Sequence, residues 1–449
     1  MRTLFSTSKL SDHVINEIII KSVHSHATKN GELTLVCKDD YFSKKVLVKT
    51  LSPSILLLLL KGLWVSLVQP KMMSSLKFDS LCIGRYAVAT AYRSYDSYVS
   101  RFALSVEYVK ALAKCALYSQ GIKLKLPDIE AAYLDNPFYH NGIFYDIFSR
   151  SGVPIYHNEY PFGLVRREPT SFGSYEDALQ VPHEELSEKE ISKGKKQLES
   201  VTRDTSKIPY MLIEFDKLRS SKKYDFVIYS HSFTDAQSCY GFDGAFNNIK
   251  EWLEFTLHEL RAFKVCVKAH PEIYTEGYTS QVVAWDRKLF AEVVERYKGY
   301  ENIDFIDYPV KNIDLLNSID ISTVLVSHHS NALLEGGLLG FKCIAARSGN
   351  WINFEIFNEW SNIQNYSSLL LSPINDLQFT NQSDLCKYYY SLYYGEGSYF
   401  SPKWWVRTVA ELCAVGVNEI VKDPEVINGM APEIVAECVK RISDEMVTM

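Results

Sequence analysis

Short apolar segments alternate with longer amphipathic segments between Tyr224 and Ala346. Each apolar segment is five or six residues long and is followed by polar residues, as is typical of a buried strand. Strands separated by helices pair in parallel, because a helical crossover returns the chain to the same edge of the sheet. The pattern therefore predicts a doubly wound α/β domain, with strands over 224–229, 263–268, 303–307, 321–326 and 342–346 and helices over 247–262, 285–297, 312–318 and 330–339.

A chain of 449 residues is too long for one compact core, so we expect two domains joined by a linker. The first part mixes helical segments with strand-like segments at 123–126 and 131–134. Residues 171–222 are rich in Glu, Lys and Ser, which favours an exposed helical linker. The predicted boundaries are 1–170 for the first α/β domain, 171–222 for the linker, 223–400 for the second α/β domain and 401–449 for C-terminal helices that pack back.

The charge balance argues against a nucleic-acid partner. Lys and Arg number 48 against 54 Asp and Glu, a net charge of −6, and no basic face is concentrated in the sequence. The nine cysteines are scattered singly with no CxxC pair, which indicates reduced thiols. The start of the chain has no secretory signal, so we expect a cytoplasmic protein.

A strongly apolar run fills most of residues 55–68 and is interrupted at Lys61. The run is shorter than the ~20 apolar residues that a bilayer-spanning helix needs. It predicts a buried helix. The alternative is a helix that lies on a membrane surface near Trp64, Lys71 and Lys77, which implies peripheral contact with the inner face of the cytoplasmic membrane.

A His-Pro pair, His270-Pro271, follows the predicted strand that ends in Lys268. Proline stops the ladder of strand hydrogen bonds and fixes the turn, so His270 is expected to project from the edge of the sheet. An imidazole at this place can donate a hydrogen bond to a phosphate, and it carries a positive charge if its pKa is raised. A structural histidine that caps a turn is the alternative.

The segment 327–330, Ser-His-His-Ser, follows another predicted strand and opens a helix with Ser330 as its N-cap. The free N–H groups and the dipole at a helix N-terminus favour an anion by roughly 0.3–1 kcal/mol. A strand that delivers His329, Ser330 and Asn331 to such a terminus is suited to hold a phosphate, which indicates a nucleotide-activated substrate. Glu335 on the same helix is a candidate acceptor for ribose hydroxyls. A plain N-cap and a solvated Glu are the alternative.

Two further loops follow predicted strands and carry polar side chains. His231 and Asp235 come after the first strand of the second domain, where Asp235 either binds substrate or caps the turn. Asp135 comes after the strand-like segment 131–134 and is a candidate general base for an acceptor hydroxyl, with turn capping as the alternative. The competing carboxylates are those of Asp79, Asp96, Asp128 and Glu130.

The histidines do not form a recognisable metal motif. Adjacent side chains such as His328 and His329 point to opposite faces of an extended segment, so we do not expect them to share an ion. The sequence has no DxD motif placed to hold a nucleotide-bound cation and no His/Cys spacing typical of zinc. We therefore expect a site that works without a metal or another cofactor.

Over about 225–350, these motifs resemble those of bacterial surface-polysaccharide glycosyltransferases of the GT-B fold. That group includes capsular and lipopolysaccharide Kdo transferases and bacterial sialyl- and polysialyltransferases. His270-Pro271 matches its HP motif, and Ser330 with Glu335 matches its Ser-headed helix. Residues 231–236, with Trp252 downstream, are similar to a segment of capsular polysaccharide biosynthesis proteins. The acidic motif that supplies the base in several sialyltransferases has no clear match.

The resemblance implies two Rossmann-like domains that face each other across a cleft, with the acceptor bound by the first and the donor by the second. It implies metal-independent, inverting transfer of a sugar to an oligosaccharide or lipid-linked glycan, with His270 at the leaving phosphate. The resemblance supplies no base, and Asp135 is the expected base from its position after the strand-like segment alone. A CMP-linked donor, Kdo or a related ulosonate, is favoured. The implied donor-binding residues are His231, Asp235, Lys268, His270, Pro271, His329, Ser330, Asn331 and Glu335.

Three other functions remain open for such a chain. A UDP- or dTDP-hexose transferase would use the same site with a different nucleotide. A polyol-phosphate transferase of the teichoic-acid type would release CMP from a CDP-polyol. A non-catalytic GT-B-like scaffold would keep the fold and tolerate the loss of His270.

Overall fold

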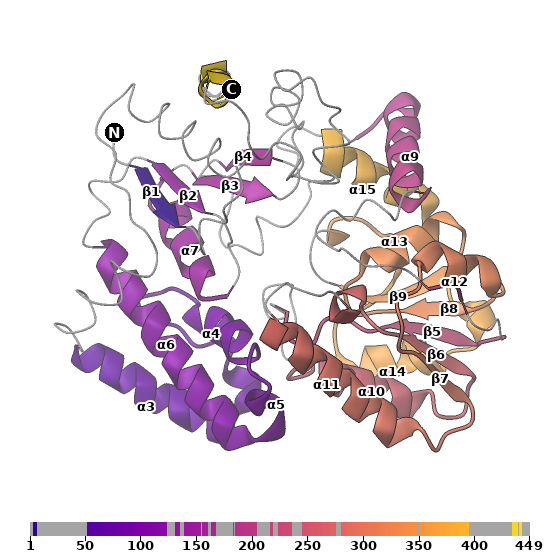
Figure 1. The fold of residues 1–449 in the computed structure, drawn as a ribbon, viewed down its shortest axis with the longest axis horizontal. Helices are drawn as coiled ribbons and strands as arrows, with labels where there is room; N and C mark the ends of the chain where they lie inside the picture. Colours follow the sequence, from indigo (N-terminus) through magenta and orange to yellow (C-terminus); the bar gives the residue numbers. More distant parts are fainter. Residues whose placement is uncertain are drawn as a thin grey trace.

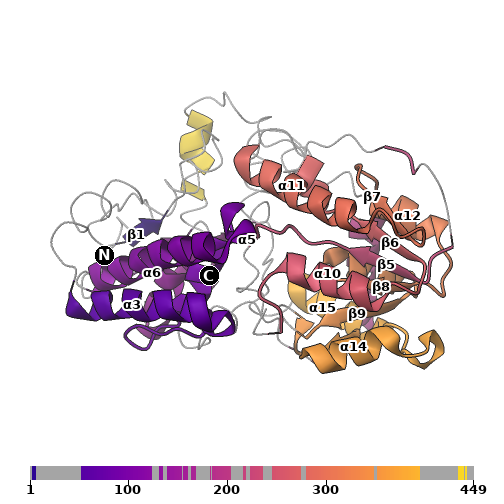
Figure 2. The same cartoon turned by 90° about the horizontal axis from the view of Figure 1, so that it is seen from below.

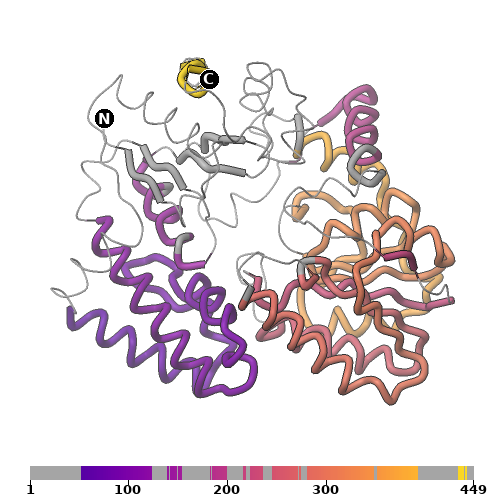
Figure 3. The backbone as a smooth tube through the Cα atoms, viewed as in Figure 1, coloured from indigo at the N-terminus to yellow at the C-terminus, as the bar shows by residue number. Residues whose placement is uncertain are grey.

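The chain forms two α/β halves, each built around its own sheet (Figure 1). A view at right angles shows the same division (Figure 2). The structure is a computed structural model. The elements described here are drawn in colour in Figure 1, and Figure 3 traces the backbone in the same view as a tube. The described residues are 3–6, 52–123, 131–134, 139–153, 155–159, 163–167, 183, 185–203, 216–218, 223–235, 245–274, 280–347, 351–394, 433–438 and 440–441.

The second half contains six parallel strands in the order β10-β9-β8-β5-β6-β7. Every residue of β5, β6, β8 and β9 is buried, so these strands appear in the sequence as continuous apolar runs. The predicted strands and the α/β class with a parallel sheet are confirmed, and β10 is an additional strand. The bounds are β5 Phe226–Tyr229, β6 Val265–Lys268, β7 Ile303–Ile306, β8 Val324–Val326, β9 Lys342–Ala346 and β10 Asn358–Trp360.

Helices cover both faces of this sheet. One face packs against α10, α11 and α14, and the other packs against α12, α13 and α15. The four helices predicted between the strands are confirmed, with ends shifted by at most five residues. The bounds are α10 Ile249–Glu259, α11 Ser280–Tyr297, α12 Asn312–Ser318, α13 Asn331–Leu338, α14 Ile363–Leu371 and α15 Gln382–Tyr394.

The first half places a helical layer beside a four-stranded sheet in the order β1-β2-β3-β4, in which only β4 is antiparallel. The strand predicted at 131–134 is β2. Lys123, predicted to begin a strand, is instead the last residue of α6, and 124–126 lie outside the described residues. The strands are β1 Thr3–Ser6, β2 Ala131–Leu134, β3 Ile155–Glu159 and β4 Gly163–Arg167, and the helices are α3 Pro53–Val68, α4 Ile83–Ala91, α5 Asp96–Val99, α6 Arg101–Lys123 and α7 Gly142–Arg150.

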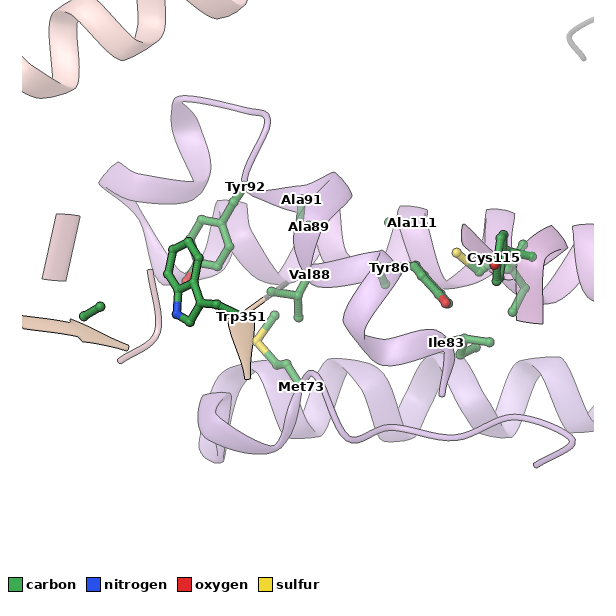
Figure 4. Packing of buried hydrophobic residues seen from close by; sticks show 14 of the residues in the cluster. Met73, Ile83, Tyr86, Val88, Ala89, Ala91, Tyr92, Ala111, Cys115 and Trp351 are labelled. Carbon is green, nitrogen blue, oxygen red and sulfur yellow. The ribbon is translucent and has the colours of Figure 1, made fainter. Parts of the chain in front are cut away.

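Buried side chains from α4 and α6, including Tyr86 and Cys115, fill the core of this helical layer (Figure 4). Two glycines allow its helices to approach closely. A Cβ on Gly84 of α4 would lie 2.1 Å from the backbone oxygen of Met73. A Cβ on Gly62 of α3 would lie 2.4 Å from a terminal methyl carbon of Leu112, on α6.

These two contacts predict different responses to the same substitution. Gly84→Ala forces a backbone to move, so we expect it to lower the free energy of unfolding by about 1–3 kcal/mol or more. Gly62→Ala needs only a side-chain rotation of Leu112, and the higher helix propensity of Ala offsets it by about 1 kcal/mol. Urea denaturation of both variants tests this; equal losses would contradict the proposed difference in packing.

The prediction that 55–68 form a buried helix is correct for one face of α3 and wrong for the other. Ile55, Leu58 and Val65 are buried, whereas the opposite side of the helix is exposed to solvent. The error arose because both faces of the helix are apolar. A sequence pattern of this kind looks the same whether one face or the whole helix is buried. Across the described ranges, every helix falls short of the length and apolar character that a bilayer crossing demands.

The linker region contains helix α9, Glu188–Arg203, which is exposed on one side only. Its Lys residues face solvent, but Leu198 is buried and the helix packs against α15. A Cβ on Gly194 would lie 2.1 Å from the backbone oxygen of Cys386, so the two helices touch at this glycine. Of the C-terminal helices predicted over 401–449, residues 433–438 and 440–441 are helical, and the rest lie outside the described residues.

The two halves contact each other through the segment around α5. Tyr95 donates a hydrogen bond to Glu292 of α11, and the Lys288 ammonium lies 3.8 Å from the centroid of the Tyr95 ring. Tyr98 donates to the backbone oxygen of Phe233, in the loop that follows β5. The first half therefore supports a loop at the edge of the second sheet.

Candidate functional site

Three neighbouring strands bring polar loops to one edge of the six-stranded sheet. β5 lies between β6 and β8, and both pairings are parallel, so the carboxyl ends of the three strands share an edge. His231 follows β5, His270 follows β6 and His329 follows β8. Ligands of doubly wound sheets bind at such an edge, which makes these loops the candidate site.

His231 is the central histidine of the three. Its ring stacks on that of His270, with 5.6 Å between centroids and 24° between the ring planes. Burial lowers the pKa of His270 and of His329 to about 3, and the proximity of His231 adds to both shifts. Both rings are therefore neutral near pH 7. A neutral His270 ring can still donate one hydrogen bond, but its pKa is lowered rather than raised, so it is not a cation.

His328 and His329 point to opposite faces of the sheet, as predicted. The His328 ring is buried and lies 5.6 Å from Trp360 and 6.2 Å from Trp252 between ring centroids. The His329 ring stacks on Trp351 at 4.4 Å with 16° between planes. His328 is thus a core residue, and His329 belongs to the cluster at the strand ends.

Two largely buried ionisable side chains belong to this edge. Lys268, at the end of β6, lies near His270, and Glu335, in the second turn of α13, lies near Lys268. Burial lowers the pKa of Lys268 to about 8, and Glu335 opposes this shift. Burial raises the pKa of Glu335, against the effects of Asn312 and Lys268. The amide nitrogen of Asn312 donates a hydrogen bond of 2.6 Å to Glu335 Oε2. Lys268 therefore remains mostly charged at neutral pH and gives the site a fixed cation.

The first half reaches the candidate site through Tyr139. Its hydroxyl donates a 3.2 Å hydrogen bond to Asp235 Oδ1, and Asp235 Oδ2 lies 3.8 Å from His231 Nδ1. The Arg93 guanidinium lies 4.3 Å from the centroid of the Tyr139 ring. Tyr139 has a φ of 57°, a left-handed conformation that costs a residue other than Gly about 1–3 kcal/mol. Strained residues of this kind concentrate at functional sites.

Asp286 of α11 holds the same loop from the opposite side. Its carboxylate accepts hydrogen bonds from the Ser232 hydroxyl and, at 2.9 Å, from the backbone N–H of Thr234. Burial raises the pKa of Asp286 to about 6, against these hydrogen bonds. The loop between His231 and Asp235 is therefore anchored by a carboxylate in the core.

The predicted N-cap and HP turn are both confirmed as local structures. Ser330 Oγ accepts a 3.2 Å hydrogen bond from the N–H of Ala332 at the start of α13. Asn331 is the exposed first residue of that helix. Pro271 opens the short 3-10 helix η7, Pro271–Tyr274, directly after His270. Binding of a donor by these residues stays a prediction.

Asp135, the predicted base, lies outside the described residues, as do Asp128 and Glu130. Its role stays a prediction. Asp79 forms an exposed ion pair of 3.3 Å with Lys123, and Asp96 is the exposed first residue of α5.

Sequence reasoning missed four residues that shape the site: Tyr139, Asp286, Asn312 and Trp351. For Asp286 a signal existed, because it occupies the apolar spacing of α11 together with Val283 and Phe290, which marks a buried polar residue. No sequence pattern marks Asn312 or Trp351, because each contacts a residue from another element. Asn312 bonds to Glu335, and Trp351 stacks on His329. Within the part of the chain that the structure describes, no three His, Cys, Asp or Glu side chains are placed to hold a metal ion.

No protein-family model matches the chain, and no curated protein matches it. The chain is similar to several solved structures at low identity, among them the following three. The KpsC β-Kdo 2,4 transferase of Thermosulfurimonas dismutans is 13% identical, with 59% of this chain and 79% of that chain covered and a TM-score of 0.36.

The UDP-GlcNAc 2-epimerase of Methanocaldococcus jannaschii, in complex with UDP-GlcNAc and UDP, is 10% identical, with 86% and 96% covered and a TM-score of 0.28. Anabaena Alr3699/HepE, in complex with UDP-glucose, is 10% identical over 100% of both chains, with a TM-score of 0.27. At these identities and TM-scores the likenesses identify no substrate for this chain.

The anchoring of the loop predicts a loss of stability in Asp286→Ala. That change leaves the buried Thr234 N–H without an acceptor, which costs about 1–3 kcal/mol of unfolding free energy. Asp286→Asn retains a carbonyl oxygen for Thr234 and is expected to cost less. Chemical denaturation compares the two variants. A smaller loss for Ala than for Asn would show that the carboxylate does not anchor the loop.

The lowered pKa of His329 predicts an acid-dependent stability term. His329 is protonated near pH 6.5 in the unfolded chain but only near pH 3 in the folded chain. Its contribution to the free energy of unfolding is therefore complete above pH 6.5 and decreases as the pH falls below that value. His329→Phe keeps a ring against Trp351 and removes the titration. We expect it to reduce the slope of unfolding free energy between pH 7 and 5 by up to about 1.4 kcal/mol per pH unit. An unchanged slope would contradict the shifted pKa.

Proposed function

We propose that this protein is a glycosyltransferase that uses a nucleotide-activated sugar, with the donor phosphate bound at the edge of the six-stranded sheet. The observation that carries the proposal is the convergence of His231, His270 and His329 at the ends of β5, β6 and β8, beside the N-terminus of α13. Neutral imidazoles, one buried ammonium and a helix N-terminus together favour a bound anion.

Each group has a distinct proposed role. His270 donates a hydrogen bond to the phosphate that leaves with the nucleotide, and Lys268 supplies positive charge close to it. An anion beside His270 favours the protonated ring, so the pKa of His270 would rise when the donor binds. Ser330 and Asn331 orient the phosphate at α13, and Glu335 accepts from the ribose. Stabilisation by these groups removes the need for a metal.

The proposed donor half is 223–400, and the proposed acceptor half is 1–170, joined by 171–222. A carboxylate deprotonates the acceptor hydroxyl, which attacks the anomeric carbon while the bond to the phosphate breaks, so the configuration inverts. Asp135 is the proposed base. Asp235 is its competitor, because it contacts His231 and is 30% exposed.

The proposed sugar is Kdo or a related ulosonate carried by CMP, moved to a growing surface glycan or a lipid-linked glycan. The motif His270-Pro271 with Ser330 and Glu335 supports this choice through its resemblance to polysaccharide transferases. A UDP- or dTDP-linked hexose is the main competing donor.

Nucleotide binding tests the proposal directly. We expect CMP to raise the melting temperature, because a ligand at a hundred times its dissociation constant adds about 2.7 kcal/mol of stability. His270→Ala is expected to weaken CMP binding about tenfold or more, since it removes one charge-assisted hydrogen bond of about 1.5–3 kcal/mol. His328→Ala is no suitable control, because that ring is in the core; His258→Ala, on the exposed side of α10, is the matched control.

The outcomes of this panel separate the competing functions. A shift with UDP or dTDP instead of CMP moves the donor to a hexose. A shift with CMP and turnover of a CDP-polyol indicates a polyol-phosphate transferase. No shift with any nucleotide rules out the proposed site and leaves the non-catalytic scaffold. With a donor and acceptor in hand, loss of turnover in Asp135→Ala but not Asp235→Ala assigns the base.

A further inference from the structure

We propose that the outer face of α3, together with the start of α6, binds the surface of a membrane that contains anionic lipids. Seven apolar side chains of α3 are between 38% and 67% exposed, at the i, i+3, i+4 and i+7 spacing of one helix face. They are Leu56, Leu57, Leu60, Leu63, Trp64, Leu67 and Val68. This set is called the outer face below. The inference stands on this surface alone and does not require nucleotide binding.

The opposite face of α3 packs against the rest of the protein. Ile55 and Val65 are buried, Gly62 lies against Leu112 of α6, and the Arg101 side chain donates a 3.3 Å hydrogen bond to the backbone oxygen of Ser66. The helix is fixed along its length on α6, at the margin of the first half (Figure 1; Figure 2). Among the described sides of α3, the outer face is the one exposed to solvent, so the helix would lie flat on a surface that it meets.

The segment that carries the outer face is basic. Residues 52–78 contain no Asp or Glu, and their charged side chains are Lys61, Lys71 and Lys77, all exposed. Phe102, at the start of α6, is 69% exposed beside Arg101. The chain as a whole carries a net charge of −6, so this positive region is local.

An apolar face with Trp64 and flanking lysines matches a lipid headgroup layer. Leucine side chains enter the acyl boundary, the indole takes the interface, and the Lys stems extend to anionic headgroups. A second copy of this chain is a poorer fit, because a symmetric contact would place the basic region of one copy against that of the other. Charge complementarity therefore selects an anionic membrane surface as the partner.

Vesicle co-sedimentation of the full chain tests the inference. We expect binding to vesicles of phosphatidylcholine with phosphatidylglycerol, and about tenfold or more weaker binding to phosphatidylcholine alone. The combined variant Leu57→Ser, Leu60→Ser and Trp64→Ser is expected to lose binding to both. Lys61→Glu with Lys71→Glu and Lys77→Glu is expected to lose the preference for phosphatidylglycerol.

The matched control replaces exposed apolar residues of the second half, Ile321→Ser with Leu371→Ser, and is expected to bind like the unaltered protein. Circular dichroism and nucleotide thermal shift verify folding of each variant, so failure of the donor site and failure of membrane binding are told apart. No binding to either vesicle, full binding by the outer-face variant, or a dimer in solution that the outer-face variant abolishes would overturn the inference.

Discussion

The parallel pairing of β5 with β6 and β8 is the constraint on which the candidate site depends. The backbone ladders align three strands whose loops are far apart in the sequence. Side chains extend this alignment beyond the strand ends. The Ser327 hydroxyl donates a 3.0 Å hydrogen bond to the backbone oxygen of Tyr229, and the N–H of His270 donates a 3.1 Å bond to Ser230 Oγ. The loops therefore begin from fixed positions, and the rings of His231 and His270 stack between two of them.

Burial decides the electrostatics of this edge. Charged imidazoles in this buried cluster, next to an ammonium, would be strongly destabilised by desolvation. His270 and His329 therefore remain neutral, whereas Lys268 is mostly a cation. Glu335, which accepts a hydrogen bond from Asn312, opposes the lowering of the Lys268 pKa by burial. An arriving phosphate would meet hydrogen-bond donors and one charge that already exist in place, so little reorganisation accompanies binding.

The sequence was sufficient where the signal was local. Strand β8, the N-cap Ser330 and the turn at Pro271 follow from short patterns, and the structure agrees with them. Asp286 and Tyr139 were not predicted to act on the loop after β5, because their partners lie on other elements and the pairing depends on tertiary packing. The pKa of His270 also escaped prediction, since burial sets it and burial depends on all the elements around the ring.

Helix α3 shows that a sequence pattern identifies an apolar face but does not tell whether that face contacts the protein interior or a membrane. Both of its faces are apolar, and a packed interior and a membrane surface favour the same side chains. In the structure, α6 covers one face, and the other leaves Leu57 67% exposed and Trp64 51% exposed in water. Contiguous apolar surface of this kind is uncommon on a protein that has no partner for it. Lysines lie within and after α3, where they favour anionic groups, and a protein interior would be a poor environment for them. The exposed outer face of α3 is therefore best matched by a lipid surface.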